Sequence, residues 1–197
     1  MRFLLLLLLV IISGFKSPVI NPTLTKWVIM NGCSLKVDGS TNINNFSCEI
    51  INYGKPDTIY INRGNNQPVQ LNGSVKLDVK NFDCHNSIMT ADLRKTLKAK
   101  ELPYLTIRFI SLSKYPDAAS KQEITKGIAV IELAGVSKQF QVDYKVVAAE
   151  NTYINLVGSR KINFSDFGLT PPRKLGGMIK TNNELSVVFD LRMKVIE

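Results

Sequence analysis

Apolar and polar side chains alternate with a period of two along three segments of the chain, residues 69–80, 139–146 and 185–195. In a β-strand, successive side chains point to opposite faces, so each segment predicts a strand with one face on a core and one in water. The rows predicted to face the core are Val69, Leu71, Val75, Leu77 and Val79; Phe140, Val142, Tyr144 and Val146; and Leu185, Val187, Phe189, Leu191, Met193 and Val195.

Shorter apolar segments predict further strands at residues 33–37, 43–51, 58–61, 105–112, 124–133 and 153–164. Turn-forming residues separate them, among them Asp38-Gly39, Gly135 and Pro171-Pro172. Many strands with regular turns favour an all-β fold, either a sandwich or a barrel.

One segment, residues 88–100, has a helical pattern instead. Its apolar residues recur every fourth position, at Met89, Leu93 and Leu97. Asn86 or Ser87 is suited to cap the first N–H groups, and Pro103 prevents the helix from continuing. A short helix lying over the end of a β-barrel fits this arrangement, and a simple packing helix is favoured over a moving lid.

The first residues predict a secretory signal peptide over residues 1–17. Arg2 is followed by an apolar run at residues 3–12 and then by small residues. The run is shorter than the ~18–20 residues that a membrane-spanning helix needs, although an uncleaved anchor stays open as the alternative. Cleavage is expected between Ser17 and Asn21. Residues 18–197 then form one β-barrel domain, located in the periplasm or secreted.

Composition and charge change this picture little. Apolar residues make up 45% and charged residues 21% of the 197-residue chain, a normal globular balance. The formal net charge is +9, but the basic residues are scattered and do not alternate with aromatic ones. A solvated basic surface is therefore favoured, with no nucleic-acid partner and with transient contact with a membrane surface left open. Nothing in the sequence sets an oligomeric state.

Three cysteines and one histidine limit the chemistry. Cys33, Cys48 and Cys84 match no zinc-binding spacing, so no metal site is predicted. In an oxidising compartment two of the three can pair, and we favour Cys48–Cys84 with Cys33 as a buried thiol. Sequence alone leaves the connectivity open.

No set of residues for catalysis is recognisable. A triad would have to be built on His85, whose neighbour Cys84 is the nearest candidate nucleophile. No third residue completes that pair, and no glycine-rich phosphate loop is present. The chain is therefore predicted not to be an enzyme, with His85 and Cys84 kept as the enzymatic alternative.

Four groups of residues resemble the YceI-like, polyisoprenoid-binding family. The first contains Trp27, Ser34, Val37, Gly39, Ser40, Thr41, Asn42, Asn44 and Phe46. The second is the helix followed by Pro103, Ile107 and Phe109, and the third is Gly127, Ile128 and Val130 with Gly135, Val136 and Lys138. The last contains Asp166-Phe167-Gly168-Leu169, Pro171-Pro172, Gly177-Met178-Ile179-Lys180 and Val187-Val188-Phe189. They occur in the order of the family and reach from Trp27 to Leu191.

The resemblance implies an antiparallel, lipocalin-like β-barrel of about eight strands with one short helix, exported and enclosing an isoprenoid or fatty chain. A quinone with an isoprenoid tail also stays open, and no other cofactor is required. One departure is Phe164, where many relatives have arginine, so the preference for a head group is open. Arg173 and Lys174 are the candidates for contact with an anionic head group, with a solvated loop as their alternative role.

Burial of a chain in a dry barrel gains about 0.8 kcal/mol per methylene, so a long apolar ligand can bind without specific polar contacts. The predicted lining consists of Trp27, Phe46, Leu71, Val75, Leu77, Phe109, Phe140, Val142, Tyr144, Phe189 and Leu191. A filled barrel would use the same residues as its core. A structural or interaction module with a filled barrel is therefore the alternative function.

Overall fold

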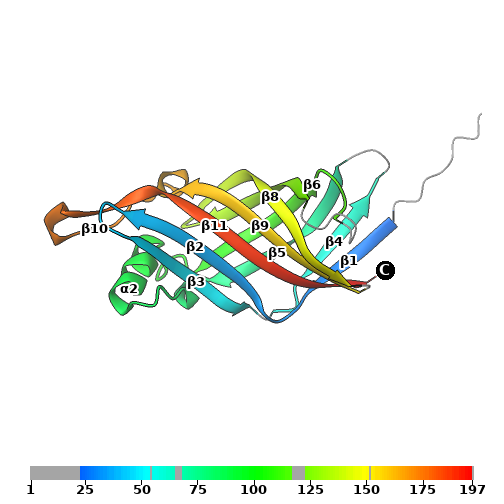
Figure 1. The fold of residues 1–197 in the computed structure, drawn as a ribbon, viewed down its shortest axis with the longest axis horizontal. Coiled ribbons are helices and arrows are strands. Elements are labelled where there is room, and N and C mark those ends of the chain that lie inside the picture. The colour runs from blue at the N-terminus through cyan, green and yellow to red at the C-terminus, as the bar shows by residue number, and fades with distance from the viewer. Residues whose placement is uncertain (1–22, 54, 65–67, 117–122, 151, 197) are drawn as a thin grey trace, which may run out of the picture.

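The structure, a computed structural model, describes residues 23–53, 55–64, 68–116, 123–150 and 152–196 (Figure 1). The predicted signal peptide lies outside these residues. The strands are β1 (Thr23–Ile29), β2 (Cys33–Thr41), β3 (Asn45–Tyr53), β4 (Thr58–Arg63), β5 (Val69–Asp78), β6 (Tyr104–Leu112), β7 (Ile124–Leu133), β8 (Val136–Glu150), β9 (Tyr153–Asn163), β10 (Arg173–Lys174) and β11 (Ile179–Ile196). The helices are α2 (Ser87–Thr96) and the 3-10 turns η1 (Val79–Asn81), η3 (Phe164–Phe167) and η4 (Leu175–Gly177).

Eight antiparallel strands close into a barrel in the order β1-β4-β5-β6-β7-β8-β9-β11. The ring is closed by pairing of β1 with the last residues of β11, where Trp27 lies opposite Val195. The predicted all-β fold, a lipocalin-like antiparallel barrel with one short helix, is confirmed. No helix among the described residues is long and apolar enough to cross a membrane.

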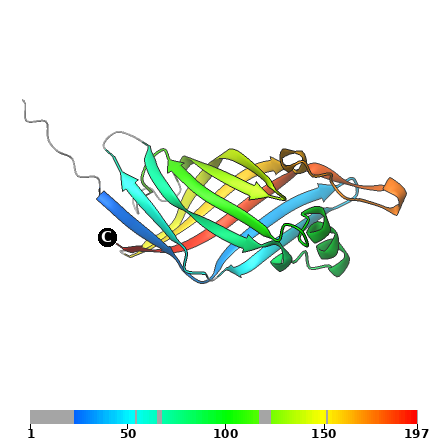
Figure 2. The same ribbon diagram turned by 180° about the vertical axis from the view of Figure 1, so that it is seen from behind.

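The hairpin of β2 and β3 extends the barrel wall beyond this ring, because β11 is long enough to pair with β2 as well as β1. β3 ends the strand order on this side, and its only strand-type pairing with the next segment among the described residues is an isolated bridge between Glu49 and Asp83. The segment that carries η1 and α2 lies at this end of the barrel (Figures 1 and 2).

Helix α2 begins where the sequence predicts and ends earlier. The Asn86 side chain accepts a hydrogen bond from the Met89 N–H at 3.0 Å and caps the first turn. The predicted helix extends to residue 100, but α2 ends at Thr96 because Lys98 adopts a left-handed φ of 56°. Thr90, Leu93 and Leu97 form its buried face.

A disulfide joins β3 to the segment that precedes α2. Cys48 and Cys84, the pair favoured from sequence, have Cα atoms 3.9 Å apart. Cys33 is a buried free thiol that donates a hydrogen bond to the Met30 carbonyl at 3.1 Å. Within the helical segment, Arg94 donates a hydrogen bond to the Phe82 carbonyl at 2.8 Å. The backbone hydrogen bonds between Glu49 and Asp83 add to the disulfide, so the segment is held to β3 by both covalent and polar contacts.

Strand β1 was missed in the sequence, although Trp27 was assigned to the lining. The reason lies in its pattern: Leu24 faces outward and is exposed, whereas Thr25 faces inward and is almost completely buried. Because a leucine faces outward and a threonine faces inward, this strand lacks the alternation of apolar and polar residues by which strands are recognised. The other predicted strands are present, with β8 and β11 longer than expected and Phe164 in η3 instead of β9.

Candidate functional site

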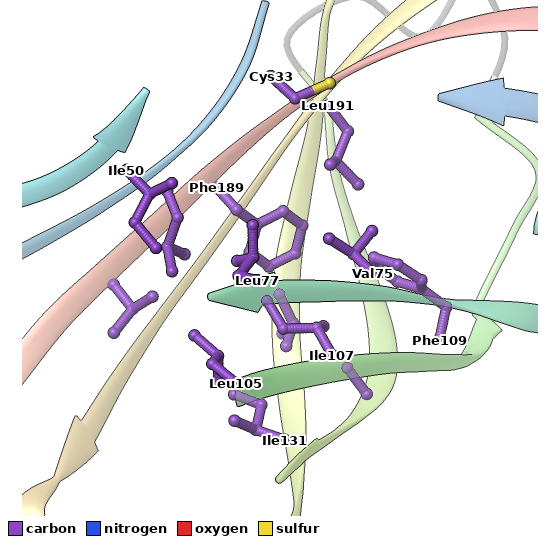
Figure 3. Close-up of a cluster of buried hydrophobic side chains, with 14 of the residues drawn as sticks. Cys33, Ile50, Val75, Leu77, Leu105, Ile107, Phe109, Ile131, Phe189 and Leu191 are labelled. Carbon is purple, nitrogen blue, oxygen red and sulfur yellow. The ribbon is translucent and has the colours of Figure 1, made fainter. Parts of the chain in front are cut away.

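The residues predicted to line the barrel lie inside it. All except Phe46 are 7% exposed or less, and Phe46 is half-buried next to the turn of the β2–β3 hairpin. Figure 3 shows part of this interior, where Val75, Leu77, Phe109, Phe189 and Leu191 lie together with further aliphatic side chains from neighbouring strands. Burial places these residues on the inner wall.

Aromatic rings occupy much of the interior. The Phe189 ring lies between Phe109 and Tyr144, with centroid distances of 6.1 Å and 5.8 Å in edge-to-face geometry. Phe140 packs against Phe167 at 5.9 Å, below the 3-10 turn η3. Edge-to-face pairs at such distances are favourable and resist displacement, so this part of the barrel has a defined packing.

Three apolar cavities follow one another from the α2 end into the barrel. The first, the mouth cavity, has a volume of about 270 Å³. Its lining comes from the β2–β3 turn, α2, η3 and the β10–β11 hairpin: Thr41, Ile43, Asn44, Phe46, Cys48, Asn86, Ile88, Met89, Asp92, Leu93, Phe164, Pro172, Lys174, Ile179 and Thr181.

The other two cavities are smaller and deeper. The middle cavity, of about 50 Å³, lies beneath Leu93 and Leu97 of α2. The deep cavity, of about 10 Å³, lies beside Phe109 and Phe189. One side chain, Leu93, therefore borders both the mouth and the middle cavity, and two, Leu35 and Ile107, border both the middle and the deep cavity along one apolar path.

Charged groups are few in the lining of the mouth cavity. Lys174 of β10 pairs with Asp92 of α2 at 2.5 Å between Nζ and Oδ2. Arg173, the other predicted head-group contact, is exposed on β10 and is not part of this lining. Phe164 is buried and contributes its ring to the wall, so the lining is apolar at the position where many relatives are expected to have arginine.

Among the buried polar side-chain atoms that have no hydrogen-bond partner within the described residues, three belong to side chains that are almost completely buried. They are Thr25 Oγ1, Trp27 Nε1 and the Tyr144 hydroxyl oxygen. Burial raises the pKa of Tyr144 well above its usual value, which keeps the phenol neutral. All three can donate a hydrogen bond, so they are candidates for contact with a polar group of a ligand.

The two residues considered for catalysis are engaged elsewhere. Cys84 is bonded to Cys48 and has no thiol to act as a nucleophile. His85 lies on the surface, with its Nε2 atom 3.0 Å from Glu49 Oε1. No group of three His, Cys, Asp or Glu side chains that could hold a metal ion occurs within the described part of the chain. The geometry gives no support to the enzymatic alternative.

Sequence reasoning missed most of the mouth cavity. Ile43, Ile88 and Ile179 line it but belong to three segments that are far apart along the chain. The available signal was weak: Ile43 is a large apolar residue in a turn of otherwise polar residues, where solvent exposure is expected. Only the closed barrel brings these residues together.

Comparison with known proteins places these features in context. The family model described as a YceI-like domain matches residues 22–193. Similar solved structures are Burkholderia cenocepacia BcnA (13% identity, TM-score 0.57, 84% of this chain and 96% of that one) and a polyisoprenoid-binding domain from Saccharophagus degradans implicated in plant cell wall breakdown (12%, 0.57, 88% and 100%). The Campylobacter jejuni YceI protein is a third (16%, 0.50, 94% and 93%). No curated protein sequence matches the chain significantly.

Proposed function

This chain belongs to the YceI-like domain family, and from that premise we propose that it sequesters or carries a long-chain isoprenoid or fatty lipid in the barrel interior. The observation that supports the proposal most directly is the path of three apolar cavities, which runs from the α2 end to the centre of the barrel. A chain without polar groups matches such a path, because burial in an apolar lining is its main source of affinity.

Binding requires the path to widen. Ligand pockets usually have volumes of about 300–1,000 Å³, whereas the middle and deep cavities measure about 50 and 10 Å³. Leu93 borders the first two cavities, and Leu35 and Ile107 border the last two, so a chain that enters must displace these side chains. A gain of about 0.8 kcal/mol per buried methylene makes such displacement favourable for a long chain.

A polar end group has potential partners inside the barrel. The unpaired donors of Thr25, Trp27 and Tyr144 suit a ligand with acceptor oxygens, such as the carbonyl groups of a quinone. A quinone with an isoprenoid tail is therefore included in the proposed ligand class. Loading from a lipid source further requires transient contact with a membrane surface, and no catalytic step is part of the proposal.

Export is the second part of the proposal. The apolar run at residues 3–12 supports a signal peptide over residues 1–17 and a location in the periplasm or outside the cell. We expect the protein isolated from its native source to begin between Ser17 and Asn21, which intact mass and N-terminal sequencing would determine. An N-terminus at Met1 or Arg2 in the isolated protein would contradict cleavage.

The small volumes of the interior cavities favour one competing function. A barrel filled by its own side chains would act as a structural or interaction module and would need no ligand. The two functions differ in one measurable respect, the capacity of the interior for a lipid.

The deciding experiment is mass spectrometry of the protein isolated from its native source, under native conditions and after solvent extraction. A stoichiometric isoprenoid, quinone or fatty species supports the carrier. A protein without bound lipid that also fails to take up added polyprenyl lipids contradicts it and favours the filled barrel.

A pair of variants tests the path itself. Ile107→Phe adds volume between the middle and deep cavities, and it should lower uptake of the fluorescent fatty acid cis-parinaric acid by about tenfold. Ile61→Phe adds the same volume at a buried position that none of the three cavities contacts and serves as the control. Equal uptake by the two folded variants would argue against the path.

A further inference from the structure

The four most exposed of the large apolar side chains in the described part of the chain all lie around the mouth cavity. They are Ile43 (65%), Ile88 (65%), Leu175 (66%) and Met178 (70%). Ile43 lies in the β2–β3 turn, Ile88 at the start of α2, and the other two in the hairpin between β10 and β11, which projects furthest from the barrel at that end (Figures 1 and 2). We call these four residues the apolar tip. Single exposed apolar residues are normal, but a group at one end indicates an interaction surface.

Hydrogen bonds and an ion pair hold the segments of the apolar tip together. The Asn42 side-chain NH₂ donates to the Met178 carbonyl at 2.9 Å, and the Lys180 N–H donates to Asn42 Oδ1 at 2.8 Å. The Asn42 N–H donates to the Lys180 carbonyl at 3.0 Å. The pair of Lys174 with Asp92 connects the hairpin to α2. The hairpin is therefore fixed against the β2–β3 turn and α2, and presents its side chains as one surface.

Leu175 has an unfavourable backbone conformation at the end of this hairpin. Its φ is 49°, in the left-handed region that branched apolar residues rarely adopt. Because two-thirds of the side chain is exposed, its packing in the fold does not explain a leucine here. Contact with something outside the molecule does explain it.

Basic residues surround the hairpin. Residues 168–183 contain Arg173, Lys174 and Lys180 and no Asp or Glu. Arg173 and Lys180 are exposed and lie opposite each other on β10 and β11, and neither forms an ion pair within the described part of the chain. Apolar side chains beyond a pair of cations match a membrane surface with anionic lipids, where the cations meet head groups and the apolar groups enter the acyl boundary.

We propose that the apolar tip docks on an anionic membrane surface, with Leu175 and Met178 inserted among the lipids, so that the mouth cavity opens toward the bilayer. The proposal rests on the proposed function, since it names the surface from which the barrel takes its lipid. Ile43, Ile88 and the exposed cations complete the contact.

The test is co-sedimentation of the mature full chain with vesicles of phosphatidylglycerol and phosphatidylcholine (1:3), compared with phosphatidylcholine alone. Leu175→Asn should lower the partition coefficient about tenfold or more, because a large apolar group no longer enters the lipid. Asn tolerates a left-handed φ, so the fold should be as stable as the wild type or more stable. Arg173→Gln should lower binding about fivefold on the anionic vesicles only.

The control variant is Ile124→Thr, which removes an exposed apolar side chain of β7 outside the tip and should bind like the wild type. The proposal is overturned if the wild type binds to neither vesicle type, a result that would favour a protein partner. It is also overturned if Leu175→Asn binds to the anionic vesicles as tightly as the wild type. Uptake of cis-parinaric acid in the absence of vesicles separates membrane docking from lipid binding in the barrel. Leu175→Asn should still take up this fatty acid. Failure of the wild type to take it up would contradict lipid binding in the barrel.

Discussion

At the scale of single residues, glycines on the inner wall make room for the aromatic rings. Gly158 of β9 lies opposite Phe189 of β11, and a Cβ atom at Gly158 would be 2.1 Å from the Phe189 ring. The ring therefore lies over the backbone of its neighbour, and this places it against Phe109 and Tyr144. The interior packing depends on the missing side chain as much as on the rings.

Gly158→Ala should destabilise the protein by about 1–3 kcal/mol, because the new methyl group overlaps with Phe189. Urea unfolding measures this cost. Phe189→Ala removes the ring that is overlapped, so Gly158→Ala should cost much less in that background. Additive costs in this double-mutant cycle would contradict the assigned contact.

Asp166 illustrates a polar residue with a local task. Its carboxylate accepts hydrogen bonds from the Lys138 ammonium and from the Asn163 N–H, the second at 2.8 Å, and so stabilises the turn η3. The hydrogen bond from Lys138 is the main cause that holds the pKa of Asp166 below its usual value of 3.8. A carboxyl with a lowered folded-state pKa stabilises the fold above the unfolded-state pKa and loses that effect as pH falls through the folded-state value.

Asp166→Asn should therefore destabilise the protein by about 1–2 kcal/mol at pH 7. The difference from the wild type should shrink as the pH falls below about 4, where the carboxyl of the unfolded chain takes up its proton before that of the folded protein does. Urea unfolding of both proteins at pH 7, 4 and 3 measures it. A difference that stays constant down to pH 3 would show that Asp166 acts without its charge.

At the scale of elements, α2 depends on links outside itself. It has only ten residues, which is too short for a stable helix in isolation. Leu93 and Leu97 pack on the barrel, and the Cys48–Cys84 disulfide fixes the segment before the helix to β3. Beyond the Glu49–Asp83 bridge, no described strand pairs with the outer edge of β3, so the disulfide is the covalent link between this edge and the helical segment.

Replacing both cysteines of the disulfide by serine should cost about 2–5 kcal/mol of stability. The loss should concentrate in α2, because its anchoring to β3 is removed while the barrel pairing stays intact. Hydrogen exchange is expected to accelerate at the amides of α2 and to change little in β7 and β8. Equal acceleration throughout the barrel would mean that the disulfide stabilises the barrel as a whole.

At the scale of the whole molecule, the mouth cavity and the apolar tip lie at the same end of the barrel. The largest of the three cavities on the path lies at the α2 end, next to the apolar tip, and the path narrows toward the barrel centre. Entry at this end then requires only local movement of α2 and of single side chains, and the strand pairing of the ring is preserved.

Leu93→Ala should join the mouth and middle cavities, since Leu93 lines both. The truncation should cost about 2–5 kcal/mol and should increase the rate of cis-parinaric acid uptake several-fold. Stopped-flow fluorescence measures the rate. Leu133→Ala, which lines the middle cavity alone, is the control; an equal acceleration there would contradict entry past Leu93.

The sequence by itself determined most of the strands and their inward faces, with β1 and the two-residue β10 as the exceptions. A period of two survives in any strand with one wet face, so β5, β8 and β11 could be recognised from a local pattern. The family motifs added the closed barrel and the position of the helix. The Cys48–Cys84 pair could be favoured but stayed one of several pairings, because spacing along the chain does not fix connectivity.

Only the tertiary structure decided how the site is assembled. Ile43, Ile88 and Ile179 line one cavity although they belong to segments far apart along the chain, and no local sequence pattern predicts that they come together. Tertiary packing also overrode the local pattern in β1, where Thr25 is buried and Leu24 is exposed. Which side of a strand a residue faces is a local property, because side chains alternate with a period of two. Cavities and surfaces instead depend on contacts between segments far apart along the chain, which only the closed fold brings together.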